Sequence, residues 1–191
     1  MRLFVALPLP DIVAQSLMLI QGGVPGARWQ TREQLHLTLR FIGEADGRDA
    51  AALDDALAAI RAPAFTLQLH AVGQFGGRQV HTLWAGLRRN QTLDYLQRKV
   101  NNAIRRVGQP QDSHKFTPHV TLARLRHSQP EKVLEWLTHH ALYTSSEFPV
   151  EAFCLYSSKL TSDGSIYRIE REYPLDAPFG RAIGDDEQAE D

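Results

Sequence analysis

Two stretches of the chain carry the same unusual pattern, an apolar run interrupted by His-x-Thr. The first is "LHLTLRFIG", with His36 and Thr38, and the second is "PHVTLARLR", with His119 and Thr121. Successive side chains on a β-strand point to opposite faces of the sheet. If both runs are strands, each buries an apolar face and presents an imidazole and a hydroxyl on the other face, roughly 7 Å apart along the strand.

Strand and helix patterns alternate in two rounds along the chain, and each round contains one His-x-Thr strand. Apolar or alternating runs predict strands, and amphipathic runs bounded by Gly or Pro predict helices. The expected strands are 2–9, 35–43, 65–73, 78–87, 117–125, 148–158 and 165–173, and the expected helices are 11–21, 47–62, 93–108 and 131–140. The sequence therefore predicts a bilobal α+β fold with an internal duplication.

Length, composition and cysteine usage narrow the class of protein. The 191 residues, 43% apolar and 23% charged, suit one sizeable domain or two small lobes packed together. The single Cys154 excludes an internal disulfide and a cysteine-based zinc site, and its apolar surroundings predict a buried, inert thiol. The N-terminal apolar run is too short for a signal peptide, and no run approaches the ~18 apolar residues of a membrane span. We expect a cytoplasmic protein.

The net charge of −1 hides an uneven distribution. The last eight residues, "GDDEQAED", contain five of the 22 acidic residues and no basic residue, which leaves 17 acidic against 21 basic residues in the body of the chain. We expect one domain over 1–175 and an acidic, disordered tail over 176–191. The mildly basic body is compatible with a phosphate-bearing ligand.

A pair of His-x-Thr strands suits the chemistry of phosphoryl displacement. The attacking and leaving oxygens stand on opposite sides of phosphorus, so a base is needed on one side and an acid on the other. Histidine can play both roles because its pKa of about 6.5 lets both forms exist near neutrality. The threonine hydroxyls can donate hydrogen bonds to the non-bridging oxygens. This chemistry requires no metal or other cofactor, and the sequence contains no convincing His/carboxylate cluster that would bind one.

The two motifs and their flanks resemble a known family. "HLTL" and "HVTL" look like the twin H-x-T-x signatures of the two-histidine (2H) phosphoesterases. "RLFVALPLP", "RWQTREQLHLTLRFIGE", "VHTLWAGL", "FTPHVTLAR" and "SSKLTSDGSIYRIE" resemble the RNA 2′,3′-cyclic phosphodiesterases, historically called 2′-5′ RNA ligases. The likeness covers residues 2–175. It implies two antiparallel sheets that form a central cleft, with helices packed on the outside.

The resemblance also implies a substrate and residue roles. The substrate is RNA, or an oligonucleotide, that ends in a 2′,3′-cyclic phosphate, and water opens the ring to leave a 2′-phosphate. As a hypothesis, His119 accepts the proton of the water, His36 donates a proton to the departing 3′-oxygen, and Thr38 and Thr121 hold the phosphate. The motifs are nearly symmetric, so the sequence does not decide which histidine is the acid. We expect a monomer.

Two arginines are candidate phosphate ligands. Arg124 matches a basic position of the family motif, but alternation places it opposite His119, so it reaches the site only if the strand ends or bulges there. Arg40 shares the face of His36 by alternation, and it is either a further ligand or a solvated arginine. Phe41 and Trp84 could stack on a base, although core packing is favoured for both. Trp29 either packs or lines the rim.

Three other interpretations remain open. The chain could be a 2H phosphoesterase that acts on another cyclic phosphate, or an RNA-binding module that keeps the pocket without turnover. It could also be a metallohydrolase with His36 and His119 as ligands, an idea that activity in EDTA would end. The other histidines, among them His70, His81 and His127, are expected at the surface or in hydrogen bonds.

Overall fold

An antiparallel sheet organises the molecule. The computed structural model describes residues 1–77, 79–110, 115–161 and 164–177. Within them the strand order is β10-β9-β1-β3-β7-β6-β5, and the short β2 pairs with β7. The strands are β1 (Arg2–Pro8), β2 (Ala27–Trp29), β3 (His36–Glu44), β5 (Leu69–Phe75), β6 (Thr82–Leu87), β7 (Val120–Leu125), β9 (Ala152–Thr161) and β10 (Gly164–Pro174). A separate two-stranded sheet pairs β4 (Phe65–Leu67) with β8 (Phe148–Val150).

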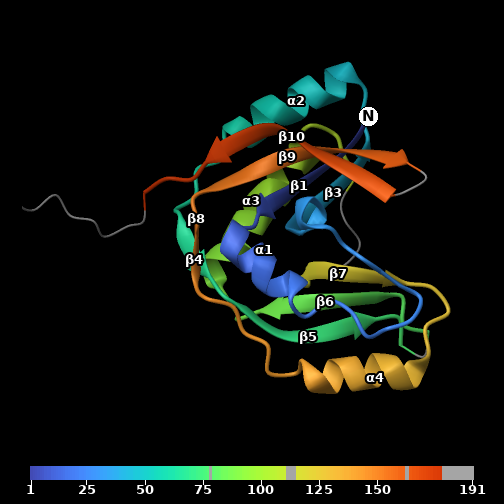
Figure 1. Cartoon of the computed structure of the whole chain (residues 1–191). Helices are drawn as coiled ribbons and strands as arrows, with labels where there is room; N and C mark the ends of the chain where they lie inside the picture. The colour runs from blue at the N-terminus through green and yellow to red at the C-terminus, as the bar shows by residue number, and fades with distance from the viewer. Residues whose placement is uncertain (78, 111–114, 162–163, 178–191) are drawn as a thin grey trace, which may run out of the picture.

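The large sheet consists of two halves that meet at its centre. The first half-sheet is β10-β9-β1-β3, and the second is β7-β6-β5 with β2. Leu37 of β3 and Val120 of β7 form the one residue pair recorded between the halves. Figure 1 shows the first half-sheet above the second, with the strands of the two halves diverging from this junction. The predicted bilobal α+β architecture with antiparallel half-sheets is confirmed.

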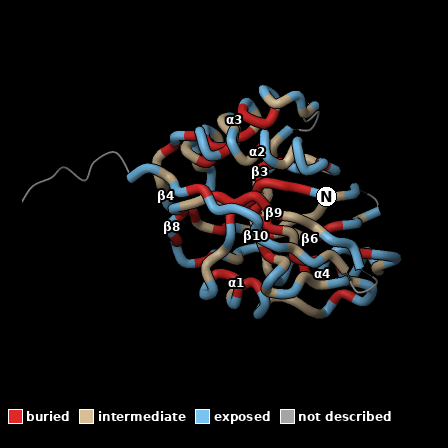
Figure 2. Tube along the Cα trace, turned by 90° about the horizontal axis from the view of Figure 1, so that it is seen from above, coloured by how far each residue is buried: buried red, intermediate tan, exposed pale blue. Residues whose placement is uncertain are grey.

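The helices cover the outer faces of the two half-sheets. α2 (Gly47–Ala58) contacts α3 (Gln91–Arg106), and α3 packs on β3. α1 (Asp11–Met18) lies beside α4 (Pro130–His139), because the indole N–H of Trp136 donates to the carbonyl of Ile20 just beyond α1, at 2.9 Å. In Figure 2 the α2/α3 pair and the α1/α4 pair lie on opposite sides of the strands. Aliphatic side chains from these helices and from the strands form the main core.

Local sequence signals explain where the helices begin and end. Asn90 caps α3 by accepting a hydrogen bond from the backbone N–H of Leu93 at 2.9 Å, and Asp46 caps α2 in the same way through Asp49 at 2.8 Å. The stretch 24–34, which we expected to be a loop, also contains β2 and a one-turn 3₁₀-helix (Arg32–Gln34). That turn follows a capping box between Thr31 and Gln34, a signal too short to predict a helix.

The C-terminal part of the chain is described only to residue 177. The predicted tail therefore lies mostly outside the described residues, and the division into domains stays a prediction. Asp176 is still bonded to the domain, since its N–H donates to Ala62 at 2.8 Å and its carbonyl accepts from Ala64 at 2.7 Å. Among the residues that the structure describes, no helix is long and apolar enough to cross a membrane.

Candidate active site

The junction between the half-sheets brings the two His-x-Thr motifs together. Leu37 and Val120 are both fully buried and point to the core face. Their neighbours in the sequence therefore point to the opposite face, where the antiparallel register sets each histidine across from the threonine of the other motif. His36 and His119 then stand diagonally, and diagonal neighbours in such a ladder are roughly 7–8 Å apart. This spacing leaves room for a phosphate group between the two imidazoles.

The same kind of hydrogen bond orients each of the two imidazole rings. Nδ1 of His36 lies 2.8 Å from the carbonyl oxygen of Gln34, and Nδ1 of His119 lies 2.7 Å from that of Thr117. In both motifs the partner is two residues before the histidine. A carbonyl only accepts, so Nδ1 carries the hydrogen and Nε2 of the neutral ring keeps its lone pair. Each histidine is therefore a proton acceptor through Nε2 until it takes up a second proton.

Each motif strand has a β-bulge directly after its threonine, and β3 has a second register shift further on, at Ile42. Along β3 the partners on β1 jump from Thr38 to Arg40, so Leu39 is the extra residue. Along β7 the partners on β6 jump from Thr121 to Ala123, so Leu122 is the extra residue. A bulge inverts the alternation of side chains beyond it. The residues five positions after each histidine thereby return to the face that carries the imidazoles.

The bulge in β7 brings Arg124 to the site, as its position in the family motif requires. Arg124 is exposed, and its charge lowers the pKa values of both His36 and His119. Its Nη1 donates a hydrogen bond of 2.8 Å to the hydroxyl of Thr82, its partner across the strands β6 and β7. Thr82 is fully buried and also lies 2.9 Å from Nδ1 of His81. Sequence reasoning missed Thr82, which stands in the quoted "VHTLWAGL" and orients the guanidinium.

The bulge in β3 moves Arg40 off the face on which alternation predicted it. Arg40, expected on the face of His36, is 7% exposed and lies on the other face, where its guanidinium donates to the carbonyl of Pro110. The expectation of a solvated arginine is therefore wrong, whereas a role as phosphate ligand stays a prediction, because Arg40 still lines the cavity that contains Thr38 and His119. Phe41 takes the place on the cleft face and is 61% exposed, so core packing is wrong for it as well. Strict alternation cannot detect the extra residue, and both errors follow from it.

Aromatic side chains surround the two histidines unequally. His36 packs against Phe4 at 4.9 Å, Tyr167 at 5.1 Å and Tyr156 at 6.0 Å between ring centroids. These three rings belong to a small second core, which also contains Cys154 and lies on the cleft face of the first half-sheet. His119 has an edge-on contact with Phe75 at 4.9 Å. The sequence assigned Phe4, Tyr156 and Tyr167 to strands and Phe75 to the turn between 65–73 and 78–87, but it gave no sign that these rings face the histidines.

Burial makes both imidazoles weak bases. The pKa of His36 is lowered to about 4, chiefly by desolvation. The charges of His119 and Arg124 act in the same direction, and the hydrogen bond to Gln34 opposes the shift. Desolvation also lowers the pKa of His119, against the bond to Thr117, and Arg124 adds to the effect. Near neutral pH both rings are therefore uncharged, and an anionic ligand is needed to stabilise the imidazolium that an acid catalyst requires.

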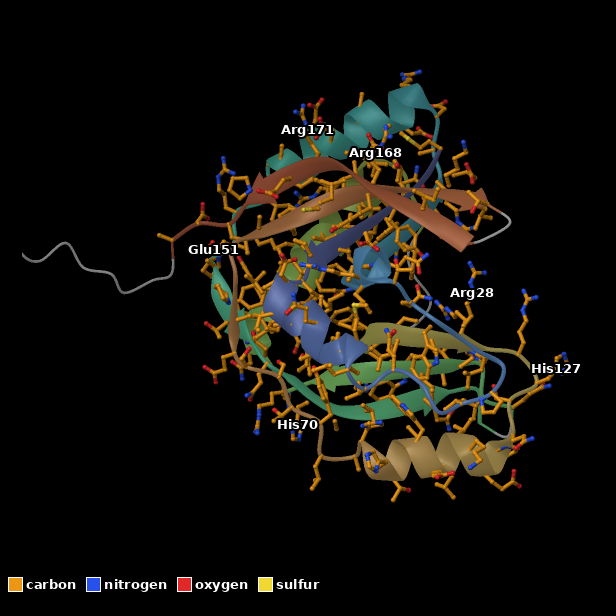
Figure 3. All side chains as sticks on the ribbon, in the orientation of Figure 1. Arg28, His70, His127, Glu151, Arg168 and Arg171 are labelled. Carbon is orange, nitrogen blue, oxygen red and sulfur yellow. The ribbon has the colours of Figure 1, made fainter. Side chains whose placement is uncertain are left out.

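The other side chains weighed in the sequence lie around this centre. Trp84 is half-buried and packs on Gly73, where a Cβ would collide with the indole. Trp29 packs on Trp136, at 5.6 Å between ring centroids, so it contributes to packing. Cys154 is fully buried, as predicted, and desolvation raises the pKa of its thiol to about 12. In Figure 3, His70 and His127 point away from the site at the edge of the molecule.

Metal binding finds no support in the arrangement of side chains. Within the ranges that the structure describes, no three His, Cys, Asp or Glu residues come close enough together to bind a metal ion. Among the described residues, His36 and His119 have no third ligand of that kind beside them. The polar groups that converge on the space between the rings are Thr38, Thr121 and Arg124, a set that suits a phosphate better than a cation.

Comparisons with known proteins find relatives over most of the chain. A family model described as "2′-5′ RNA ligase superfamily" matches residues 21–161. The RNA 2′,3′-cyclic phosphodiesterase of Thermus thermophilus is 31% identical over 195 residues, covering 95% of this chain and 93% of that protein. That of Archaeoglobus fulgidus is 29% identical over 174 residues, covering 88% and 97%. The crystal structure of Escherichia coli LigT complexed with 3′-AMP superposes with a TM-score of 0.75 at 26% identity, covering 91% and 97%.

Proposed function

Because the chain belongs to the 2′-5′ RNA ligase superfamily, we propose that it is an RNA 2′,3′-cyclic phosphodiesterase. It hydrolyses a terminal 2′,3′-cyclic phosphate to a 2′-phosphate without a metal or other cofactor. The observation that carries the proposal is the pair of imidazoles on one face of the sheet, both fixed through Nδ1 with Nε2 available. An in-line displacement needs two such groups, one on each side of phosphorus.

The proposed reaction assigns one task to each residue. His119 accepts the proton of the attacking water at Nε2, and the new bond forms between the water oxygen and phosphorus. The bond from phosphorus to the 3′-oxygen breaks, and His36 donates a proton from Nε2 to that oxygen. Thr38 and Thr121 donate hydrogen bonds to the non-bridging oxygens. Arg124, which Thr82 orients, neutralises the charge that develops there.

The low pKa of His36 bears on this assignment of acid and base. With a pKa of about 4, the imidazolium of His36 is a strong proton donor, but only a small fraction of the rings carries the second proton near neutral pH. The bound cyclic phosphate carries a negative charge, which raises the pKa of both rings and charges the one that it approaches more closely. The assignment therefore depends on how the ligand sits, and a substrate whose leaving group needs no proton tests it directly.

The same site supports a second reaction with a different nucleophile. With a 5′-hydroxyl in place of water, the displacement joins two RNA ends through a 2′-5′ bond and releases the same 3′-oxygen. We propose that the protein acts as a monomer in the cytoplasm on RNA or oligonucleotides. Size-exclusion chromatography with light scattering, and imaging of a tagged chain in its host, test these two statements.

The test of the function is hydrolysis of an oligoribonucleotide that ends in a 2′,3′-cyclic phosphate, measured in EDTA from pH 5 to 9. We expect a 2′-phosphate product and a bell-shaped pH profile for the wild type. His36→Ala and His119→Ala should each lose about 10²–10⁴-fold in kcat. His127→Ala, on the surface away from the site, is the matched control.

Four results would contradict the proposal. Wild-type rates in both site variants would exclude two-histidine catalysis. Loss of activity in EDTA would favour the metallohydrolase. An inert wild type that still binds the RNA would favour a binding module, and turnover of another cyclic phosphate in place of RNA would name a different member of the superfamily.

A further inference from the structure

The two ends of the site differ in whether a strand of RNA can leave through them. β3 and β7 are antiparallel, so the end of β3 at Phe41 lies next to the segment that leads into β7, and the end of β7 at Arg124 lies next to the segment that leads into β3. The first will be called the Phe41 end and the second the Arg124 end. A substrate cleaved at its terminus needs an exit at only one of them.

At the Arg124 end, described side chains from β2 and from the segment before β3 lie against the start of β10. The side-chain amide of Gln34, just before β3, donates a hydrogen bond of 2.8 Å to the carbonyl of Ser165 at the start of β10. Arg28 pairs with Arg124 across β2 and β7, and its guanidinium packs against Gly164 so closely that a Cβ there would collide with it. Figure 3 shows Arg28 in the space between β7 and the β9–β10 hairpin.

At the Phe41 end, the described residues leave a cavity that is lined by aromatic rings. A cavity of about 310 Å³ begins at the catalytic residues and continues past exposed or half-buried rings; its lining includes Thr38, Phe41, Phe75, Lys115, Phe116 and His119. Exposed aromatic faces and a lysine suit unpaired bases and the backbone of a single strand, because every base can stack on a ring.

This cavity adjoins a second, basic pocket on α3. The pocket has a volume of about 170 Å³ and shares Arg40 as a wall with the cavity; its lining is Arg40, Arg98, Asn101, Asn102 and Arg105. None of these five residues is acidic. Arg98 and Arg105 are exposed on one face of the helix, two turns apart, and the two asparagine amides lie between them. Guanidinium and amide donors around a concave surface match the acceptor oxygens of a phosphate.

We propose that the 5′ part of the RNA leaves the site through the Phe41 end and that an upstream backbone phosphate binds between Arg98 and Arg105. The inference rests on the proposed function and adds to it the direction of the strand and a second contact outside the catalytic centre. It also fits the proposed terminal phosphate, since Gln34 and Arg28 lie against β10 at the Arg124 end. A solvated basic face without ligand is the alternative, and it is one outcome of the test.

The test compares two double variants with the same change of charge on the same helix. Arg98→Glu with Arg105→Glu reverses the charge of the two exposed arginines of the pocket. Lys99→Glu with Arg106→Glu reverses the charge of two neighbouring residues that do not line it. Each protein is assayed on a cyclic mononucleotide and on a 5′-fluorescein octaribonucleotide that ends in a 2′,3′-cyclic phosphate. The pocket variant should raise KM for the octamer by about tenfold or more and leave the mononucleotide unchanged. The control should leave both within about threefold.

The salt dependence provides the second measurement. Each phosphate contact to a single strand contributes about 0.7 to the slope of log affinity against log salt. Fluorescence anisotropy with the same octamer, carrying a 2′-phosphate so that it cannot turn over, should lose about 0.7–1.4 of this slope in the pocket variant alone.

The outcomes separate the two proposals. Equal octamer KM in wild type and pocket variant, or equal losses in pocket variant and control, would overturn the exit path. A pocket variant that fails equally on the mononucleotide would also overturn it, because the defect would then lie in the catalytic centre. If the wild type hydrolyses neither substrate, the proposed function fails, and the salt slopes of octamer binding still decide whether the pocket binds RNA.

Discussion

The half-sheet around His36 and the half-sheet around His119 share one plan but surround their histidines differently. Both have a ring held through Nδ1 by the carbonyl two residues earlier, a threonine two residues later and a bulge after it. His36, however, packs against three aromatic rings, whereas His119 lies beside two, Phe75 in an edge-on contact and Trp84 at 6.3 Å between ring centroids. The shared plan makes two equivalent bases, so only the surroundings can give the two rings different roles.

The positions after the bulges show the same divergence. In the second half, Arg124 contacts the buried hydroxyl of Thr82. In the first half, the equivalent position is Phe41, which packs beside Phe4 at 5.9 Å between ring centroids. One half therefore offers a charged group to an anion and the other offers an aromatic ring to an apolar ligand surface. A nucleotide has both kinds of surface, and a strictly symmetric site would match only one of them.

The largest expected effect comes from removing each histidine in turn and supplying a leaving group that needs no proton. Both alanine variants should lose about 10²–10⁴-fold on the ordinary substrate. On a cyclic substrate with sulfur in place of the 3′-oxygen, the variant that lacks the acid should recover most of this loss. We expect the recovery in His36→Ala. Recovery in His119→Ala instead would reverse the roles, and recovery in neither would contradict this division of labour.

Stability against pH measures the unequal burial. The folded-state pKa of His36 is about 4, below the unfolded value of about 6.5, so the unfolded chain binds more protons between these values. The protein should therefore lose stability as the pH falls from about 6.5 to 4, by on the order of 3 kcal/mol from this residue. Urea titrations at pH 7 and 4.5 for wild type and His36→Ala isolate this contribution. An equal loss in both proteins would mean that His36 is not desolvated.

Arg124 and Phe41 test the divergence at equivalent positions. Arg124→Met should lower kcat/KM for a cyclic mononucleotide by about 10–100-fold, because a charge-assisted hydrogen bond to phosphate contributes about 1.5–3 kcal/mol. Arg126→Met, exposed two residues further on, should change it little. Phe41→Ser should mainly raise KM for the octamer, with a mild effect on the mononucleotide. If Arg124→Met and Phe41→Ser had equal effects on both substrates, the two positions would not differ in function.

Thr82 gives the smallest expected effect. Thr82→Val keeps the shape of this buried side chain and removes the acceptor of Arg124, so the guanidinium is no longer fixed. We expect KM to rise about threefold to tenfold while the pH profile keeps its shape. The double variant with Arg124→Met should be no worse than Arg124→Met alone. Additive losses would show that Thr82 acts through another contact.

The sequence predicted the elements and the four central side chains because both depend on short-range periodicity. The alternation around His36 and His119 was enough to place them on the face opposite Leu37 and Val120. It failed for Arg40 and Phe41 because a single extra residue in β3 leaves no mark in the pattern. The rings of Phe4 and Tyr156 come from strands far apart in the sequence, and their approach to His36 depends on the strand order, which no local pattern specifies.

The bulges at Leu39 and Leu122 also have a consequence for protein engineering. Because of them, the number of residues after the threonine decides which side chain faces the cleft, so this number matters to the site as much as the residue types do. Lengthening β7 by one residue directly after Thr121 would keep every side chain of the site and still turn Arg124 toward the core. A library that varies only residue types would never sample that failure, nor the reciprocal change, in which lengthening β3 directly after Thr38 would turn Arg40 to the face of His36.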